Sequence, residues 1–214
     1  MAIVIDVFRA CSVVAHALAA GAARVIPVED VEAARELKRA NPDWLLVGER
    51  HARRLPGFDC GNSPTEVLAV PGLAGRTLVH TTHAGTQGLA AAARSADAVL
   101  TGAFVNAAAT VRRVRALGAR EVTIVAMGHE ARERCVEDSL CGELLRARLL
   151  GEAFDESRIV PALRAAPAAV KFFDPAADWA PEGDFALCSA LDVHDFAVQL
   201  RPQPEGFPAL ERVA

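Results

Sequence analysis

The chain has 214 residues, of which 52% are apolar and 23% charged, and its formal net charge is -4 at pH 7. This length suits one well-cored domain, and the composition is that of an ordinary globular protein. The mildly negative charge, with arginines scattered along the chain, argues against a nucleic-acid or anionic-membrane surface. We expect no transmembrane segment, since no apolar stretch approaches the roughly 18–20 residues that a span needs. Five cysteines without a C-x-x-C pair, and no signal peptide, favour a reduced, cytoplasmic protein.

Strands and helices alternate along the first 150 residues. In chain order we expect a strand at Ala2–Val7, a helix at Cys11–Ala20, a strand at Arg24–Val28, a helix at Glu29–Ala40, strands at Trp44–Val47 and Arg76–His80, a helix at Gly85–Arg94, a strand at Ala98–Thr101, a helix at Asn106–Leu117, a strand at Glu121–Ala126 and a helix at Val136–Leu150. Short, continuous apolar strands that alternate with helices predict an α/β fold. The expected architecture is a mainly parallel sheet flanked by helices on both faces, in three α/β/α layers.

The pattern becomes less regular from about residue 152. Ile159–Ala169 has helical character, Lys171–Asp184 is rich in proline and irregular, and Phe185–Leu191 suits a last strand or helix. No internal repeat or clear linker interrupts the chain. We therefore predict a single domain over residues 1–214.

Four of the apolar runs end in loops that are rich in carboxylates, hydroxyls, glycine or arginine. These loops begin at Asp6, Gly48 and Thr81 and after Ala126. If the runs are parallel strands, the loops share one edge of the sheet, where open α/β folds bind ligands. The residue types suit a metal ion together with an oxyanion such as phosphate.

The first loop places Asp6 at the end of a strand and Arg9 at the start of a helix. A carboxylate there can hold a divalent cation, and a guanidinium can bind phosphate oxygens in bidentate fashion. The backbone N–H groups of the following helix would add to an oxyanion site. Equally, Asp6 can cap the helix and Arg9 can form a surface ion pair.

The second loop again pairs an acid with a base, Glu49 with Arg50, directly after a strand. Further along it come Asp59, Asn62 and Ser63, which supply a carboxylate, an amide and a hydroxyl. Ser63, followed by proline, also fits a helix N-cap. That interpretation leaves Asp59 and Asn62 unexplained, and so long a loop is unusual without a function.

The third loop surrounds Gly85 with hydroxyls, among them Thr82 and Thr86. Hydroxyls and a glycine turn before a helix form an anion cradle, although this is not a P-loop. His80 and His83 have an H-x-x-H spacing, but no third ligand is nearby in the sequence, and we expect no zinc site. His83 fits either a local general acid or an exposed loop histidine.

The fourth loop leads to Glu137 and Asp138 at a helix start, where the helix dipole alone would favour carboxylates. Cys141 lies on the same helix face and fits a small buried residue rather than a nucleophile. Several familiar chemistries lack their motifs: no cysteine has Arg six positions later, Phe8 breaks an Asp-x-Asp pair, and neither G-x-S-x-G nor G-x-G-x-x-G is present.

Together these loops resemble the 2-phosphosulfolactate phosphatase family. The segments that carry the resemblance are Asp6-Val7-Phe8-Arg9-Ala10, Gly48-Glu49-Arg50, Phe58-Asp59-Cys60-Gly61-Asn62-Ser63-Pro64, Thr81-Thr82-His83-Ala84-Gly85-Thr86 and Glu137-Asp138-Ser139-Leu140-Cys141-Gly142. Their order and spacing match over roughly residues 1–145. The resemblance implies an α/β fold and a Mg²⁺-dependent hydrolase that releases phosphate from 2-phospho-3-sulfolactate, an intermediate on a route to coenzyme M.

Three features depart from the family pattern. Relatives usually carry a segment before the first Asp-x-x-Arg strand, whereas this chain begins in that strand. Gln87 stands where many relatives have an arginine, which removes an anion contact, and Cys11 replaces a small hydroxyl residue. The substrate is therefore expected to be a phosphate ester, and the sequence does not determine whether its second anionic group is a sulfonate.

We interpret the loops as the site of metal-assisted phosphomonoester hydrolysis. The expected catalytic residues are Asp6, Arg9 and Asp59; the expected substrate-binding residues are Arg50, Asn62, Ser63, Thr82, Gly85 and Thr86; the expected Mg²⁺ ligands are Asp6, Glu137, Asp138 and Glu49. The attacking group is either an aspartate or a metal-bound water, with water favoured.

Two other classes stay open at this stage. A non-catalytic binding protein for a phosphorylated or sulfonated metabolite would use the same loops without turnover. A cysteine-dependent enzyme would use Cys60 or Cys141 and would be inactivated by thiol alkylation. The expected partner is a small-molecule phosphate ester, with neither nucleic acid nor membrane, and a homodimer is a reasonable expectation.

Overall fold

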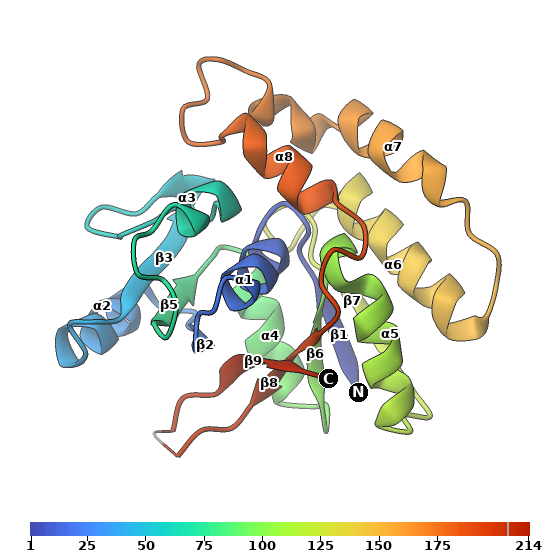
Figure 1. The fold of residues 1–214 in the computed structure, drawn as a ribbon, viewed down its shortest axis with the longest axis horizontal. Helices are drawn as coiled ribbons and strands as arrows, with labels where there is room; N and C mark the ends of the chain where they lie inside the picture. The colour runs from blue at the N-terminus through green and yellow to red at the C-terminus, as the bar shows by residue number, and fades with distance from the viewer. Residues whose placement is uncertain (205) are drawn as a thin grey trace.

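A mixed sheet, with nine strands among the residues that the structure describes, runs through the centre of the protein (Figure 1). This computed structural model describes residues 1–204 and 206–214. In chain order the strands are β1 (Ala2–Ile5), β2 (Arg24–Pro27), β3 (Leu45–Arg50), β4 (Arg53–Arg54), β5 (Thr77–Thr81), β6 (Val99–Gly102), β7 (Thr123–Ala126), β8 (Ala197–Arg201) and β9 (Ala209–Val213). Their order across the sheet is β4-β3-β5-β2-β9-β8-β6-β1-β7. The α/β fold class is confirmed.

The sheet contains two groups of parallel strands separated by an antiparallel hairpin. One group is β3-β5-β2, the other is β6-β1-β7, and β8 and β9 pair antiparallel between them. Because the hairpin intervenes, the two groups do not belong to one continuous parallel sheet. The junction between β2 and β9 is narrow, with Val25 and Leu210 as its registered pair. Figure 1 shows the first group inclined to the second.

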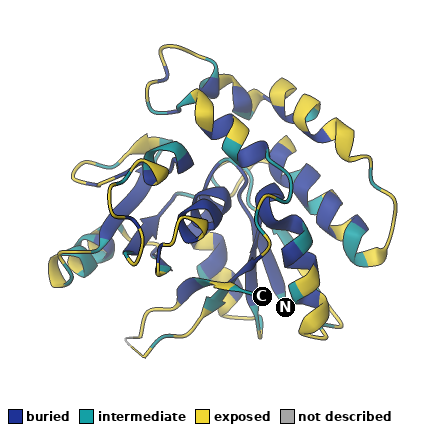
Figure 2. Ribbon diagram, in the orientation of Figure 1, coloured by how far each residue is buried: buried dark blue, intermediate teal, exposed yellow. Residues whose placement is uncertain are grey.

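Helices cover both faces of each parallel group. The α-helices are α1 (Ala10–Ala19), α2 (Val31–Ala40), α3 (Pro64–Leu68), α4 (Gly85–Ala93), α5 (Ala107–Ala116), α6 (Val136–Leu150), α7 (Ile159–Ala165) and α8 (Glu182–Ser189). In β1, Val4 packs in one cluster with α4, whereas Ile3 and Ile5 pack in another with α5 and α6. In β2, Val25 packs with α1 and Ile26 with α2. Strands buried on both faces (Figure 2) explain the continuous apolar runs in the sequence.

The C-terminal quarter differs most from expectation. The helix expected at Ile159–Ala169 ends at Ala165, because Ala166 precedes a proline and adopts an extended conformation, and a 3₁₀ helix, η3 (Pro167–Phe172), follows. The expected element at Phe185–Leu191 lies largely within α8. Strands β8 and β9 were not expected from the sequence. Leu163 of α7 and Cys188 of α8 belong to the same apolar cluster as Ile3, so this part shares a core with the first strand.

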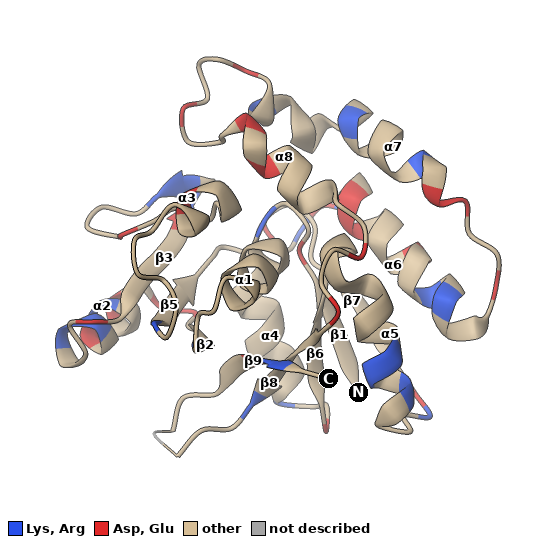
Figure 3. Cartoon of the chain, in the orientation of Figure 1, with Lys and Arg blue, Asp and Glu red and all other residues tan. Residues whose placement is uncertain are grey.

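Within the described part of the chain, no helix combines the length and apolar character that crossing a membrane requires. Basic and acidic residues are distributed over several helices and loops (Figure 3).

Candidate active site

A cavity of about 440 Å³ opens where the loops that follow β1, β3, β5 and β7 meet. Residues from η3 and from the loop before α8 complete its wall. Its lining residues are Asp6, Phe8, Arg9, Glu49, His51, Ala52, Asn62, His83, Ala84, Gly128, His129, Glu130, Cys135, Glu137, Pro167, Ala168, Lys171 and Trp179. The four strand-end loops noted in the sequence therefore do converge, although they come from two separate groups of strands.

Asp6 directly follows β1 and lies buried at the cavity wall. Its Oδ1 accepts a hydrogen bond of 3.1 Å from the backbone N–H of Ala10, so it also serves the start of α1 as expected of a cap. Burial, reinforced by the charge of Glu49, raises the pKa of Asp6 to about 6 despite that hydrogen bond. A Cβ at Gly85 would lie 2.9 Å from Oδ2 of Asp6. Glycine at this position thus lets the start of α4 approach the carboxylate.

Glu49 and Glu137 bring two more carboxylates into the cavity, and both are buried. Glu49 is fully engaged with backbone, because Oε1 accepts from His83 N at 2.8 Å and Oε2 from Ala52 N at 2.7 Å. Glu137 is different, since its Oε2 is buried without a hydrogen-bond partner among the described residues. Burial also raises the pKa of Glu137. An unpaired buried carboxylate oxygen is costly, and a bound cation would satisfy it.

Asp138, which we expected to bind metal, has a different place in the structure. Its Oδ1 accepts from Val7 N at 2.7 Å and its Oδ2 from Gly128 N at 2.8 Å. It ties the end of β1 to the loop after β7 and is not one of the cavity's lining residues. Burial and the nearby charge of Asp6 raise the pKa of Asp138. The geometry makes Asp138 a positioning residue for the Asp6 loop.

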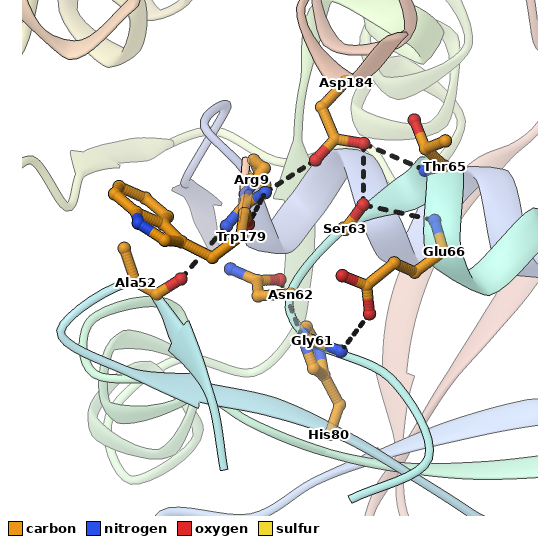
Figure 4. A network of polar contacts seen from close by, with 10 residues as sticks. All are labelled: Arg9, Ala52, Gly61, Asn62, Ser63, Thr65, Glu66, His80, Trp179 and Asp184. Atoms are coloured by element: carbon orange, nitrogen blue, oxygen red, sulfur yellow. Dashed lines mark hydrogen bonds and ion pairs between the residues drawn. The ribbon is translucent and has the colours of Figure 1, made fainter. Parts of the chain in front are cut away.

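Arg9 lines the cavity but is held by a buried network (Figure 4). Its Nη1 donates to Oδ2 of Asp184 at 2.6 Å and to the backbone oxygen of Trp179 at 3.2 Å. Oδ1 of Asp184 accepts from Ser63 Oγ at 2.8 Å and from Thr65 N at 2.9 Å. The surface ion pair considered for Arg9 is thus a buried one, with a partner from α8 that the sequence did not indicate.

Asn62 and Ser63 are neighbours with different surroundings. Asn62 lines the cavity, and its Oδ1 lies 3.1 Å from Nε2 of His80. Burial lowers the pKa of His80 to about 4, so the neutral ring donates to Asn62 and leaves the amide NH₂ as a donor for a ligand. Ser63 is the N-cap of α3, with its Oγ accepting from Glu66 N at 3.2 Å. The N-cap interpretation of Ser63 is confirmed, and its hydroxyl does not reach the cavity.

Two charged residues of the second loop lie away from the cavity. Arg50 donates to the backbone oxygen of Glu29 at 3.0 Å and to Thr81 Oγ1 at 3.0 Å, which fastens β3 to β5. Asp59 accepts from Leu46 N at 2.7 Å, near the beginning of β3 rather than its end. Neither residue lines the cavity, and the geometry gives no support to their expected binding and catalytic roles.

The side-chain hydroxyls of Thr82 and Thr86 form hydrogen bonds with each other's backbone. Thr82 Oγ1 accepts from Thr86 N, and Thr86 Oγ1 accepts from Thr82 N, each at 3.2 Å. Both side chains are buried and neither lines the cavity. The expected anion cradle is therefore not open to a ligand, because its hydroxyls are hydrogen-bonded to backbone at the start of α4. Gly85, in the same segment, leaves room for the Asp6 carboxylate.

The cavity contains functional groups that sequence reasoning missed. Lys171, in η3, faces the carboxylates: burial and the charge of Arg9 lower its pKa, whereas Glu137 and Asp6 act in the opposite direction. Lys171 and Trp179 come from the proline-rich segment, where no motif marked them. The one available signal was rarity, because Lys38 and Lys171 are the chain's two lysines.

The cysteines do not resemble nucleophiles. Cys60 and Cys141 are buried, and burial raises the pKa of both thiols. Cys135 lines the cavity, but burial and the charge of Glu137 raise its pKa to about 12. Thiols that are protonated at neutral pH are poor nucleophiles, which argues against a cysteine-dependent enzyme.

Comparison with known proteins identifies the family. The chain matches the family described as 2-phosphosulpholactate phosphatase over residues 1–200. The chain belongs to this family. The 2-phosphosulfolactate phosphatase resemblance inferred from the loops is thereby confirmed, over a longer stretch than the loops themselves cover.

Several curated relatives carry the name probable 2-phosphosulfolactate phosphatase. One from Deinococcus radiodurans is 42% identical over 132 residues, which is 62% of this chain and 55% of the relative. One from Thermoplasma volcanium is 29% identical over 162 residues, or 76% of this chain and 74% of the relative. One from Bacillus subtilis is 28% identical over 213 residues, or 99% of this chain and 91% of the relative. The chain thus spans little more than half of the Deinococcus protein.

Proposed function

We propose that the protein is a Mg²⁺-dependent phosphomonoester hydrolase that converts 2-phospho-3-sulfolactate and water to 3-sulfolactate and phosphate. The observation that carries the proposal is the buried Oε2 of Glu137, which has no hydrogen-bond partner among the described residues and lies in the same cavity as Asp6. Family membership and the names of the relatives support the reaction class and the substrate. We also propose that this reaction lies on a route to coenzyme M and that the protein is cytoplasmic.

The charge of the cavity supports a cation. Four carboxylates line the cavity, those of Asp6, Glu49, Glu130 and Glu137. Beside the histidines, one lysine and one arginine face them, Lys171 and Arg9, and Arg9 already pairs with a buried aspartate. A phosphate ester would meet net negative charge in this cavity. A divalent cation between the carboxylates and the phosphate removes that repulsion, and Mg²⁺ prefers oxygen ligands of this kind.

The donor set fits Mg²⁺. Asp6 and Glu137 would hold the ion, because each has an oxygen without a hydrogen bond to the described residues, and Glu49 would lie beside them with both oxygens held by backbone amides. When bound, Mg²⁺ would stabilise negative charge on the transferring phosphoryl group. Asp59 lies elsewhere, so it is not a candidate nucleophile.

The chain's own residues account for the remaining steps. Arg9, Lys171 and the NH₂ of Asn62 would donate hydrogen bonds to the anionic oxygens of the substrate. In the reaction a water oxygen forms the new P–O bond, the ester P–O bond breaks, and the leaving alkoxide takes a proton from a donor. One hydrogen of the water stays on the released phosphate, and the other leaves as the proton that restores the donor. Lys171 is our candidate for that proton donor, because its lowered pKa makes the ammonium a better acid.

A phosphatase screen tests the proposal. Purified protein is assayed for phosphate release from a panel of phosphomonoesters that includes 2-phospho-3-sulfolactate, with Mg²⁺ and with EDTA. We expect release with Mg²⁺, loss of activity in EDTA and recovery when Mg²⁺ is restored. Binding of the esters without turnover, at a Mg²⁺ concentration that fills the site, would instead identify a non-catalytic binding protein.

A further inference from the structure

Three side chains from three strand-end loops meet at the mouth of the cavity. They are His51 in the turn between β3 and β4, His83 in the loop after β5, and Glu130 in the loop after β7. One ligand atom of each lies within 4.8 Å of those of the other two. His51 Nδ1 is 3.0 Å from Oε1 of Glu130, and the rings of His51 and His83 have centroids 5.5 Å apart. We propose that these three residues bind a divalent transition cation, such as Zn²⁺ or Co²⁺, separately from the carboxylate site.

The ligand chemistry distinguishes the two sites. Two imidazoles and one carboxylate are a ligand set typical of zinc, and three protein ligands leave a coordination position open. Mg²⁺ prefers oxygen, so it should favour Asp6 and Glu137. The pairwise limit of 4.8 Å exceeds the roughly 3.3 Å between neighbouring ligands of a tetrahedral zinc, as follows from metal–ligand bonds of about 2.0–2.1 Å. The exposed His51 side chain can make up that difference by a small movement.

The histidine that lies deepest in the cluster has an unused nitrogen. His83 Nδ1 is buried and has no hydrogen-bond partner among the described residues. A buried imidazole nitrogen without a partner is costly, and a cation or a water bound to it would satisfy the ring. The H-x-x-H spacing of His80 and His83, from which we expected no zinc site, indeed forms no metal-binding pair, because His80 lies against Asn62. The two ligands that join His83, namely His51 and Glu130, come from loops that follow other strands.

The surrounding backbone is arranged to hold these three loops together. The carboxylate of Glu49 accepts from His83 N and from Ala52 N, next to His51, so one buried side chain fixes both histidine loops. His51 and Glu130 each have φ of 52°, in the left-handed region that non-glycine residues seldom adopt. Such conformations persist where the surrounding structure imposes them, and they are common at functional sites.

The site would place a positive charge at the entrance to the proposed phosphatase site. All three ligands line the cavity that contains Asp6 and Lys171. The open coordination position would therefore be available to an anionic group of a molecule entering the cavity. Binding of the cation does not depend on turnover, so the inference stands apart from the proposed function and is measured without substrate.

The test is a titration of tag-free, chelator-treated and dialysed protein with Co²⁺ in excess Mg²⁺, followed by visible absorption. We expect one equivalent of Co²⁺ to bind with a band typical of nitrogen ligation, and Zn²⁺ to abolish that band by displacement. No band in the presence of Mg²⁺ would overturn the site.

Variants identify the ligands. His51→Gln is the first choice, because the side chain is 75% exposed and its replacement should leave the fold intact. We expect His51→Gln, His83→Gln and Glu130→Gln each to weaken Co²⁺ binding at least about tenfold, since loss of a residue that only supports a metal ligand already costs that much. His129→Gln is the matched control, since His129 lines the same cavity outside the cluster, and it should bind Co²⁺ like the wild type. Unchanged binding by His51→Gln, or an equal loss in His129→Gln, would contradict the assignment.

A further variant separates this inference from the proposed function. Asp6→Asn should retain the Co²⁺ band while losing phosphatase activity. A wild-type protein that hydrolyses phosphate esters but shows no Co²⁺ band refutes the transition-metal site alone. One that binds Co²⁺ as described but hydrolyses no ester refutes the phosphatase alone.

Discussion

The buried ion pair between Arg9 and Asp184 gives the sharpest prediction about stability. Asp184→Ala removes the partner of a guanidinium that is 2% exposed, and the aspartate itself is 0% exposed. It also removes the acceptor for Ser63 Oγ and Thr65 N. Removal of one partner of a buried pair costs about 3–5 kcal/mol, because the other charge stays buried without compensation. We expect the free energy of unfolding to fall by that amount.

The assay is urea unfolding followed by circular dichroism, with the slope of the transition compared between variants. Glu152→Ala is the control, because the Arg146–Glu152 pair has side chains 61% and 49% exposed. Exposed pairs contribute about 0–1 kcal/mol, so the control should unfold almost as the wild type does. Asp184→Asn should lie between Asp184→Ala and the wild type, since it keeps an acceptor but loses the charge.

A double variant separates burial of charge from loss of packing. Arg9→Met combined with Asp184→Leu leaves no unpaired charge, and it should be less destabilised than Asp184→Ala alone. A loss below about 1 kcal/mol in Asp184→Ala, equal to that of the exposed control, would refute the reasoning. It would mean that the guanidinium finds other partners or solvent.

Three further predictions concern the cavity. In EDTA, the wild type should lose up to about 3 kcal/mol of stability as pH rises from about 4 to about 6, because the folded-state pKa of Asp6 is raised from 3.8 to about 6 and the folded state keeps the proton over that range. Asp6→Asn should therefore be more stable than the wild type at pH 7.5 but not at pH 4 in thermal unfolding, and an equal difference at both pH values would contradict this. Lys171→Met should lower kcat by about 100-fold, as loss of a general acid does, while Lys38→Met, at the chain's other lysine, should leave kcat unchanged. Thr86→Val should cost about 1 kcal/mol in urea unfolding without a change in KM, since its buried hydroxyl accepts from Thr82 N and donates to the backbone oxygen of Thr82; a raised KM at unchanged stability would restore the substrate-binding role.

The sequence predicted the parallel strands well because burial on both faces makes most positions of the central strands apolar. Ile3 and Val4 face different helices, yet both must be apolar. Strands β8 and β9 escaped prediction for the opposite reason. They pair with each other as well as with the distant strands β6 and β2, but Gln199, Glu211 and Arg212 interrupt their short apolar runs.

The candidate site was predicted in part. Asp6, Glu49 and Glu137 were placed in it by their position after strands or at a helix start, and the structure brings all three to one cavity. Thr82 and Asp59 have the same residue types as functional groups but serve a helix cap and a strand edge. Side-chain type alone does not distinguish these uses, because hydroxyls and carboxylates satisfy backbone N–H groups as readily as ligands.

Other parts of the site could not be read from the sequence at all. Asp184 and Lys171 lie in a region without a regular pattern, more than 160 residues from Asp6. The fold alone brings Lys171 to the cavity and Asp184 to Arg9 in its wall. His51 and Glu130 are likewise joined by tertiary structure. Residues that come together from different loops follow no local spacing rule, so they can be identified when the topology is known.

The most direct test of the account is a Mg²⁺ titration of phosphate release from 2-phospho-3-sulfolactate, run in parallel on the wild type and on Asp6→Asn. We predict saturable activation by Mg²⁺ in the wild type and no measurable turnover in Asp6→Asn, with unchanged circular dichroism. Phosphate release that is independent of Mg²⁺, or wild-type rates in Asp6→Asn, would contradict a metal-assisted phosphatase centred on this cavity.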